Sequence, residues 1–395
     1  MAVAAPYLRA AHVQPFGHLI GVETKSMWFE PQELAAHDLK RGDVIIVEGG
    51  AGFGRSAVLE QDRPGWGFQN SILRFRARPD RAVGRFVNYA LQSALHAGQV
   101  AAACNTATIP HFTADKVAAI LVPTPDVGAQ TAIADYLDRE TAQIDTLIEK
   151  QQQLIATLRE RHSLLVLHTV TRGLGAAQTM PSGVGWVGAI PIHWNIRRVS
   201  WLFRSVGSGT TPNPEEILPA GSLHSVAWVT TGELRENEVT ETRNCVSFDT
   251  IAKLSALRIH PRGSLVIAMY GATVGRLGIL DIAATTNQAC CVMSNPVGVL
   301  TEFAYFLLLA ARDHLLRQAS GGGQPNINQD KIRSLRVPTP PIAEQQQIVE
   351  YLQQKTTSTQ LLIAKADQLI VLSKERRSAL ITAAVTGQID VRAAA

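Results

Sequence analysis

The chain has 395 residues, of which 46% are hydrophobic and 18% are charged, so it is neither intrinsically disordered nor collagen-like. A formal net charge of +4 is mildly basic, which permits nucleic-acid binding without requiring it. The longest apolar run, Phe303–Ala311, is too short to span a bilayer, and the first residues lack the pattern of a secretory signal. We therefore expect a cytoplasmic protein of two or three domains.

Cysteine and histidine residues do not form a recognisable metal or catalytic pattern. Cys104, Cys245, Cys290 and Cys291 lack metal-ligand spacing, and the adjacent pair lies in an apolar run. The histidines are scattered along the chain. We interpret the cysteines as buried free thiols in a reducing compartment, and we expect no metal and no cofactor.

Residues 1–121 are expected to form a first globular region of short strands. The strand-like run Val44–Val47 is followed by Gly49–Ser56, which resembles a phosphate-binding loop with Arg55 in place of lysine. A matching segment, Gly271–Leu277, has no Ser or Thr after Arg276. A glycine turn between two strands is therefore favoured over nucleotide binding.

Residues 122–174 contain a stretch that the chain repeats. Val122–Leu174 aligns with Val337–Ile389 at a constant offset of 215, and 21 of the 53 aligned pairs are identical. A match of this length without gaps indicates an internal duplication. Each copy begins after Val-Pro-Thr-Pro and contains no further proline or glycine until Gly173 or Gly387, apart from Gly128 and Pro341 near the starts. Each copy therefore predicts one helix of about 44 residues that ends at a glycine cap.

Apolar residues recur at spacings of seven along the first predicted helix and indicate a coiled-coil seam. They are Leu137, Ile144, Leu158 and Leu165, with Leu147 and Leu154 beside them. Residues 175–336 leave the end of one helix and enter the start of the other, so the helices should pack antiparallel. The predicted fold is α+β, with two globular regions separated by a long two-helix coiled coil and related by a pseudo-two-fold axis.

The predicted domains are 1–121, a first globular region; 122–174, a first spacer helix; 175–336, a second globular region; and 337–395, a second spacer helix with the tail. The globular regions are themselves related. Asp43–Arg55 aligns with Ser264–Arg276 at offset 221, and Lys116 aligns with Lys331 at offset 215. Val184–Gly221 has no counterpart in the first half. The sequence thus predicts a first region that lacks its front segment.

Several polar residues at predicted turns suit DNA. Arg55 and Arg276 could grip guanine or phosphate, and Asn287, Gln288, Gln324 and Asn326 carry amides that pair with adenine. Lys116 and Lys331 suit phosphate contacts. Simpler alternatives stand beside each: a solvated turn arginine or a surface ion pair, an Asx turn that caps into a strand for the amides, notably Asn328, and surface lysines that favour solubility.

With these features in place, the chain resembles the specificity subunit of type I restriction-modification systems. The resemblance rests on the two Val-Pro-Thr-Pro segments with their glutamines and helices, on Ile190–Trp194, on the Gly271–Gly275 turn and on Gly323–Ile327. The first copy departs from the fuller Pro-Pro-x-x-x-Gln signature at Asp126 and Ala129.

This resemblance implies a non-catalytic subunit of a restriction and methyltransferase complex. The globular regions would be target recognition domains, each reading one half of a split site in double-stranded DNA. The helices would set the spacing and dock methyltransferase subunits, with restriction endonuclease and translocase subunits as further partners. Two alternatives remain open: a coiled-coil assembly protein that does not read DNA, and a truncated, inactive specificity subunit. An enzyme would need a catalytic motif, and none withstands comparison of the repeats.

Overall fold

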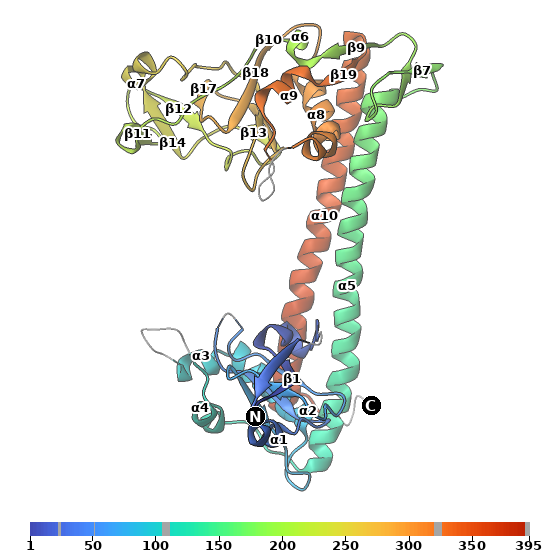
Figure 1. Ribbon diagram of the computed structural model, residues 1–395. Coiled ribbons are helices and arrows are strands. Elements are labelled where there is room, and N and C mark those ends of the chain that lie inside the picture. The colour runs from blue at the N-terminus through green and yellow to red at the C-terminus, as the bar shows by residue number, and fades with distance from the viewer. Residues whose placement is uncertain (23–24, 51, 105–110, 320–325, 392–395) are drawn as a thin grey trace. The chain divides into compact units, whose positions relative to one another are not determined.

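The computed structural model describes the whole chain except residues 23–24, 51, 105–110, 320–325 and 392–395 (Figure 1). The chain divides into two compact units. Unit 1 comprises residues 1–154 and 365–395, and unit 2 comprises residues 155–364. Each unit combines one β-containing region with a stretch of both long helices, which gives the α+β class that the sequence predicts.

The two predicted long helices are confirmed as α5 (Val127–Arg172) and α10 (Ile342–Val385). Gly173 follows α5 with a φ of +75°, and Gly387 follows α10 with a φ of +74°. Such a left-handed backbone costs little only in glycine, which explains why both helices end there.

The two long helices run antiparallel in both units. In unit 1, Ile133 and Leu137 pack with Ile381 and Val385, while Asp145 further along α5 contacts Arg377. In unit 2, His162 bonds Thr356 at 2.9 Å, and Val166 shares a core with Leu352.

The apolar seam of these helices differs from the prediction. Leu137, Ile144, Ile148, Ile155 and Ile370 are buried. The expected seam residues Leu147 and Leu154 are instead exposed, as are Leu362 and Leu369. The buried residues keep the seven-residue spacing, but the second row of the seam lies four residues after the first, at Thr141, Ile148 and Ile155, and not three residues after it. The isoleucine of each Leu-Ile pair therefore faces inward and the leucine outward.

Unit 1 contains two three-stranded sheets, ordered β2-β1-β5 and β4-β3-β6. The strands are β1 (Val3–Leu8), β2 (Ser26–Phe29), β3 (Val44–Val47), β4 (Ser56–Val58), β5 (Gly67–Phe68) and β6 (Ile72–Phe75). The helices before α5 are α1 (Pro31–His37), α2 (Gly84–His96), α3 (Gln99–Ala103) and α4 (Ala114–Ala119). The fully buried strand β3 joins the cores beneath both sheets.

Unit 2 contains a five-stranded sheet, β10-β18-β15-β16-β13, and a four-stranded sheet, β11-β14-β12-β17. Two strand pairs, β7 with β8 and β9 with β19, complete it. The strands are β7 (Thr179–Pro181), β8 (Ala189–Pro191), β9 (Asn195–Arg198), β10 (Phe203–Ser208), β11 (Ile217–Pro219), β12 (Ser225–Val229), β13 (Asn237–Val239), β14 (Asn244–Ser247), β15 (Leu265–Ala268), β16 (Leu277–Leu280), β17 (Ala284–Thr286), β18 (Cys290–Pro296) and β19 (Arg336–Thr339). The helices are α6 (Val199–Leu202), α7 (Phe248–Lys253), α8 (Thr301–Arg317) and α9 (Gln329–Ser334).

Strand register shows that the two β regions share one plan. Ile45 pairs with Ala57 between β3 and β4, and Val266 pairs with Gly278 between β15 and β16. Ile45 and Val266 lie 221 residues apart, as do Ala57 and Gly278, which is the offset that the sequence alignment predicts. Strands β9, β10 and β11 come from the segment 184–221, which has no counterpart in the first half. Unit 2 therefore carries added strands on a shared frame.

A buried glutamine joins the β region of each unit to its long helix. In unit 1, Gln130 Oε1 accepts from the Val83 N–H at 2.9 Å, while its Nε2 donates to the carbonyls of Arg81 and Pro125 at 3.1 and 2.8 Å. In unit 2, Gln345 makes the same three contacts at 2.8, 3.1 and 2.8 Å, with Leu300, Gly298 and Pro340. Both side chains are almost fully buried. We call each set of three hydrogen bonds a glutamine bridge.

We predict that Gln345→Leu destabilises unit 2 by about 3 kcal/mol or more, since it leaves one N–H and two carbonyls buried without partners. Urea unfolding followed by tryptophan fluorescence measures the change. Gln346→Leu, one residue further on the same helix but exposed, is the matched control and should change stability by less than about 0.5 kcal/mol. Equal effects of the two substitutions would show that the bridge does not hold the junction together.

A second buried polar cluster lies in the core of unit 2. His260 Nδ1 lies 3.1 Å from Ser294 Oγ, which lies 2.9 Å from Ser264 Oγ, and all three side chains are buried. Burial, with a smaller contribution from the nearby Arg258 charge, lowers the pKa of His260 to about 4. The imidazole is therefore neutral in the folded state at physiological pH.

We predict that acid weakens unit 2 through this histidine. Above pH 6.5 His260 is neutral in both states, but between pH 6.5 and about 4 the unfolded state takes up a proton that the folded state resists. The loss of stability should reach about 3 kcal/mol by pH 4. Urea unfolding at pH 7 and pH 4 should show that His260→Gln removes this part of the pH dependence. An unchanged dependence in the variant would assign acid sensitivity to other groups.

Candidate nucleic-acid interface

Three loops of unit 2 meet around Tyr270, which follows β15. Tyr270 forms a β-bridge with Asn326, and its hydroxyl donates to the backbone carbonyl of Gln288. The Gln288 side-chain carbonyl in turn accepts from the Thr211 hydroxyl. The loops that carry Gln288 and Asn326, both predicted from sequence, are thus brought together at Tyr270, and both side chains are exposed. Burial raises the pKa of Tyr270, so its hydroxyl remains protonated and continues to donate at neutral pH.

Arg276 lies at the end of a tight hairpin turn between β15 and β16. The turn is closed by the Ala268 N–H donating to the Arg276 carbonyl and the Gly275 N–H donating to the Ala268 carbonyl, both at 2.8 Å. Gly271 and Gly275 have φ values of +83° and +79°, which requires glycine at both corners. The Arg276 side chain is exposed. This turn therefore presents a guanidinium on a rigid support.

Arg55 occupies the matching turn in unit 1, with the same two hydrogen bonds to Val47 at 2.8 Å. An antiparallel strand, β4, follows this turn, whereas a phosphate-binding loop leads into a helix. The interpretation as a turn between strands is confirmed. Arg55 differs from Arg276 in being half-buried, where it lines a pocket of about 220 Å³ with Phe16 and Arg377.

The amide side chains also take part in the local structure. Asn287 Oδ1 accepts from the Ala289 N–H at 3.1 Å, which is an Asx turn. Asn328 Oδ1 accepts from the Lys331 N–H at 2.9 Å and caps the helix α9, where the sequence predicts an Asx turn that leads into a strand. Gln324 lies outside the described residues. Asn287 therefore has a structural role in addition to any contact with DNA.

The two lysines bind backbone carbonyls within their own units. Lys116 Nζ donates to the His111 carbonyl at 2.8 Å, and Lys331 Nζ donates to the Gln318 carbonyl. Each ammonium has three donors, so these bonds still allow a phosphate contact. Tyr270 and Thr211 were not predicted from sequence, because only the fold brings their loops to Gln288.

Within the described ranges, no group of three or more His, Cys, Asp or Glu residues could hold a metal ion. Among the same residues, no helix is long and apolar enough to cross a membrane. Comparison with known proteins then identifies the family. The family model for the type I restriction modification DNA specificity domain matches residues 31–156 and 191–370. The chain belongs to this family. Membership confirms the resemblance that the duplicated helices and turns suggest.

Two curated relatives support this assignment. The chain is 22% identical over 296 residues to the EcoBI specificity subunit of Escherichia coli, which covers 72% of this chain and 61% of that subunit. It is 24% identical over 140 residues to the EcoR124I/EcoR124II specificity subunit of the same species, which covers 34% of each. The matches thus span about a third and about three fifths of the length of these relatives.

Two solved structures share the fold of this specificity-domain protein. One is a chain from a study of complex assembly and conformational transition in the type I R-M system, with a TM-score of 0.71 at 17% identity over 97% of this chain and 92% of that chain. The other is the HsdS subunit from Thermoanaerobacter tengcongensis, with a TM-score of 0.54 at 15% identity over 98% of this chain and 92% of that subunit.

Proposed function

We propose that this protein is the DNA sequence-specificity subunit of a type I restriction-modification complex. The observation that carries the proposal is the family match across both β regions, each of which holds a glycine-cornered hairpin turn ending in arginine. Residues 1–121 and 175–336 would be the two target recognition domains, and 122–174 and 337–395 the spacer helices. Each recognition domain would read one half of a split site in double-stranded DNA. The subunit itself would be non-catalytic, and cleavage and methylation would belong to its partners.

We propose Arg55, Lys116, Arg276, Asn287, Gln288, Gln324, Asn326 and Lys331 as the DNA-contacting residues, and we add Tyr270 and Thr211 as groups that position Gln288. Arg276 and the exposed amides suit base edges, and the lysines suit phosphates. The matching bridge in unit 1 pairs Gly49 with His111, in place of Tyr270 with Asn326. The two half-sites should therefore differ in sequence.

The partners would include methyltransferase subunits, together with restriction endonuclease and translocase subunits. Exposed leucines on α5 and α10 support docking by apolar contact: Leu147, Leu154, Leu164, Leu361, Leu362, Leu369 and Leu372. Side chains of this kind gathered on helices mark interaction surfaces. The long helices would also set the separation of the two half-sites.

We predict that Arg276→Ala weakens binding to the cognate half-site by about 1–3 kcal/mol if the guanidinium reads a base, because a bidentate contact is lost. The protein, reconstituted with its methyltransferase subunits, first selects its site from a random duplex library, and the affinity for that site is then measured. Arg276→Lys should also lose most of this preference, since an ammonium cannot make the bidentate contact.

Arg262 provides the matched control for Arg276. It is an exposed arginine at the opposite end of β15, paired with Asp281 at 2.6 Å, and Arg262→Ala should leave the selected sequence unchanged. If Arg276 touches only phosphate, binding falls equally on all sequences and the salt dependence decreases. An unchanged affinity and salt dependence would remove Arg276 from the interface.

We predict that Leu154→Glu reduces methyltransferase binding at least tenfold while leaving the unfolding transition in place, because Leu154 is 45% exposed and packs little in the subunit itself. Gln152→Glu, an exposed polar position two residues earlier on α5, is the matched control and should bind normally. Co-purification and titration calorimetry measure the effect. Normal binding by Leu154→Glu would place the docking surface elsewhere.

A further inference from the structure

Units 1 and 2 each contain a sheet of the same plan, and the two sheets differ most at one edge. In unit 2, β18 is covered at its edge by β10, with Gly207 paired to Val292. Next to it β9 pairs with β19, and α6 packs against α9. Val199, Leu202, Phe203 and Val206 of this segment are buried in the main core. Residues 195–208 thus cover three elements of unit 2, namely β18, β19 and α9. We call residues 195–208 the cover.

Unit 1 retains the same three elements. By register β6 corresponds to β18, since Ile46 pairs with Leu73 and Ile267 pairs with Cys291. By offset α4 corresponds to α9, and residues 121–124 correspond to β19. Among the described residues of unit 1, no strand pairs with the outer edge of β6. A groove of about 400 Å³ lies there instead, lined by Leu73, Phe75, Val117, Ala118, Ile120 and Val122 among others.

The apolar side chains beneath the cover are buried in unit 2, and the matching side chains of unit 1 are less buried. Ile332, Leu335 and Val337 of unit 2 are buried, with 0%, 6% and 1% exposure. The residues that match them, Val117, Ile120 and Val122, are only partly buried. Unit 1 therefore keeps the apolar side chains that the cover buries in unit 2.

The same Val-Pro-Thr sequence shows the effect on the backbone. In unit 2 it lies in β19, paired with β9, whereas in unit 1 it has no regular secondary structure. An edge strand and an extended segment with unpaired backbone groups are templates for strand addition.

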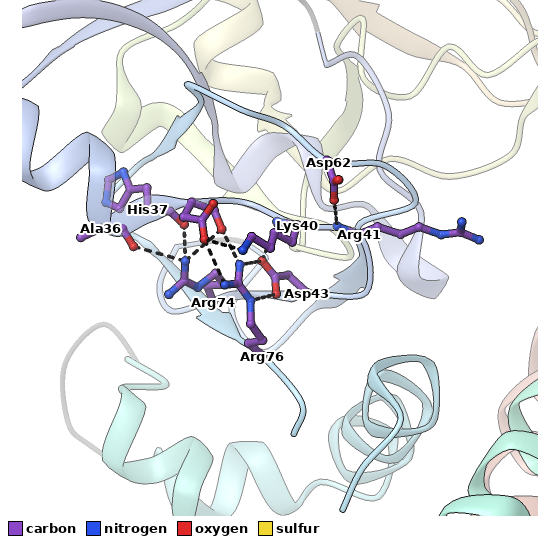
Figure 2. A network of polar contacts seen from close by, with 9 residues as sticks. Ala36, His37, Lys40, Arg41, Asp43, Asp62, Arg74 and Arg76 are labelled. Carbon is purple, nitrogen blue, oxygen red and sulfur yellow. Dashed lines mark hydrogen bonds and ion pairs between the residues drawn. The ribbon is translucent and has the colours of Figure 1, made fainter. Parts of the chain in front are cut away.

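The charged side chains in β6 and directly after it, Arg74 and Arg76, are bonded to other parts of unit 1. Figure 2 shows Arg74 pointing to the carbonyls at the end of α1, where its Nη1 lies 3.2 Å from the Ala36 oxygen and also bonds His37. Arg76 pairs with the buried Asp43 at 2.6 Å. These bonds hold both guanidinium groups within unit 1, so the remaining groove is mainly apolar and suits an apolar ligand.

We propose that this groove binds an extended polypeptide segment with the chemistry of residues 195–208, which adds as an antiparallel strand to β6. Its side chains would follow the pattern of Ile196, Val199, Leu202, Phe203 and Val206. The elements that line the groove in unit 1 are duplicated in unit 2, where residues 195–208 occupy the equivalent place. The proposal does not depend on DNA binding.

The test uses a fluorescent peptide with the sequence of residues 189–210 and the protein of residues 1–395. Anisotropy should show saturable binding with a Kd on the order of 10 µM. Hydrogen exchange of the complex should show protection of the β6 amides and of residues 121–124. A peptide carrying Leu202→Asp and Val206→Asp, which keeps the length but breaks the apolar pattern, should bind at least tenfold more weakly.

Two adjacent alanines of α4 supply the matched variants. Ala118 and Ala119 are both exposed, but only Ala118 lines the groove, so neither substitution should unfold the protein. Ala118→Glu should weaken peptide binding at least tenfold, and Ala119→Glu should not change it.

Three results would overturn the proposal. One is the absence of saturable binding up to about 1 mM peptide. Another is equal binding by the two variants, which would place the peptide elsewhere. The third is concentration-dependent dimerisation that Ala118→Glu abolishes and that blocks the peptide, which would make a second copy of this chain the occupant.

Discussion

The structure depends on one interaction that occurs twice, the glutamine bridge at Gln130 and Gln345. A single amide joins three backbone segments in each unit: the start of a long helix, the proline segment before it, and the start of the helix that supports the sheet. Because a buried amide without partners is costly, the junction has little freedom to bend. The duplicated glutamine thus sets how each β region meets its helix, whatever its loops contain.

The sequence predicts the elements that depend on local signals. It does not predict the features that depend on packing or pairing with another part of the chain. Pro, Gly and apolar spacing located both long helices to within two residues, because proline and glycine act through their own backbone angles. The seven-residue spacing correctly predicts that Leu137 and Ile144 are buried. It also predicts a seam position for Leu147 and Leu154, yet these are exposed, because adjacent apolar residues do not reveal which one faces inward. Val-Pro-Thr is a strand only where β9 pairs with it, and no local rule could distinguish the two copies.

The candidate site shows the same division. The hairpin turns ending at Arg55 and Arg276 could be predicted, because glycine spacing after an apolar run has few other solutions. At Asn328 the local role of the side chain could be predicted, but the element that follows is a helix and not the expected strand. The cluster of Tyr270, Thr211 and Gln288 could not be predicted, since it joins loops that lie up to 77 residues apart in sequence. Which of these side chains would touch bases in the proposed function depends on loop positions that only tertiary packing determines.

The repeated frame has diverged where it carries no structural constraint. Phe16 and Glu236 follow matching strands, and both have a positive φ, at 68° and 65°. In unit 1, Phe16 packs under the buried Arg377 guanidinium, which pairs with Asp145 at 2.9 Å. In unit 2, Glu236 pairs with Arg312, the position of Arg377 is taken by His162, and a cavity of about 460 Å³ remains. Both bridges survive, while the surfaces around them differ. Under the proposed function, duplication followed by such local divergence would let the two β regions recognise different ligands, because the loops change without moving the strands that support them.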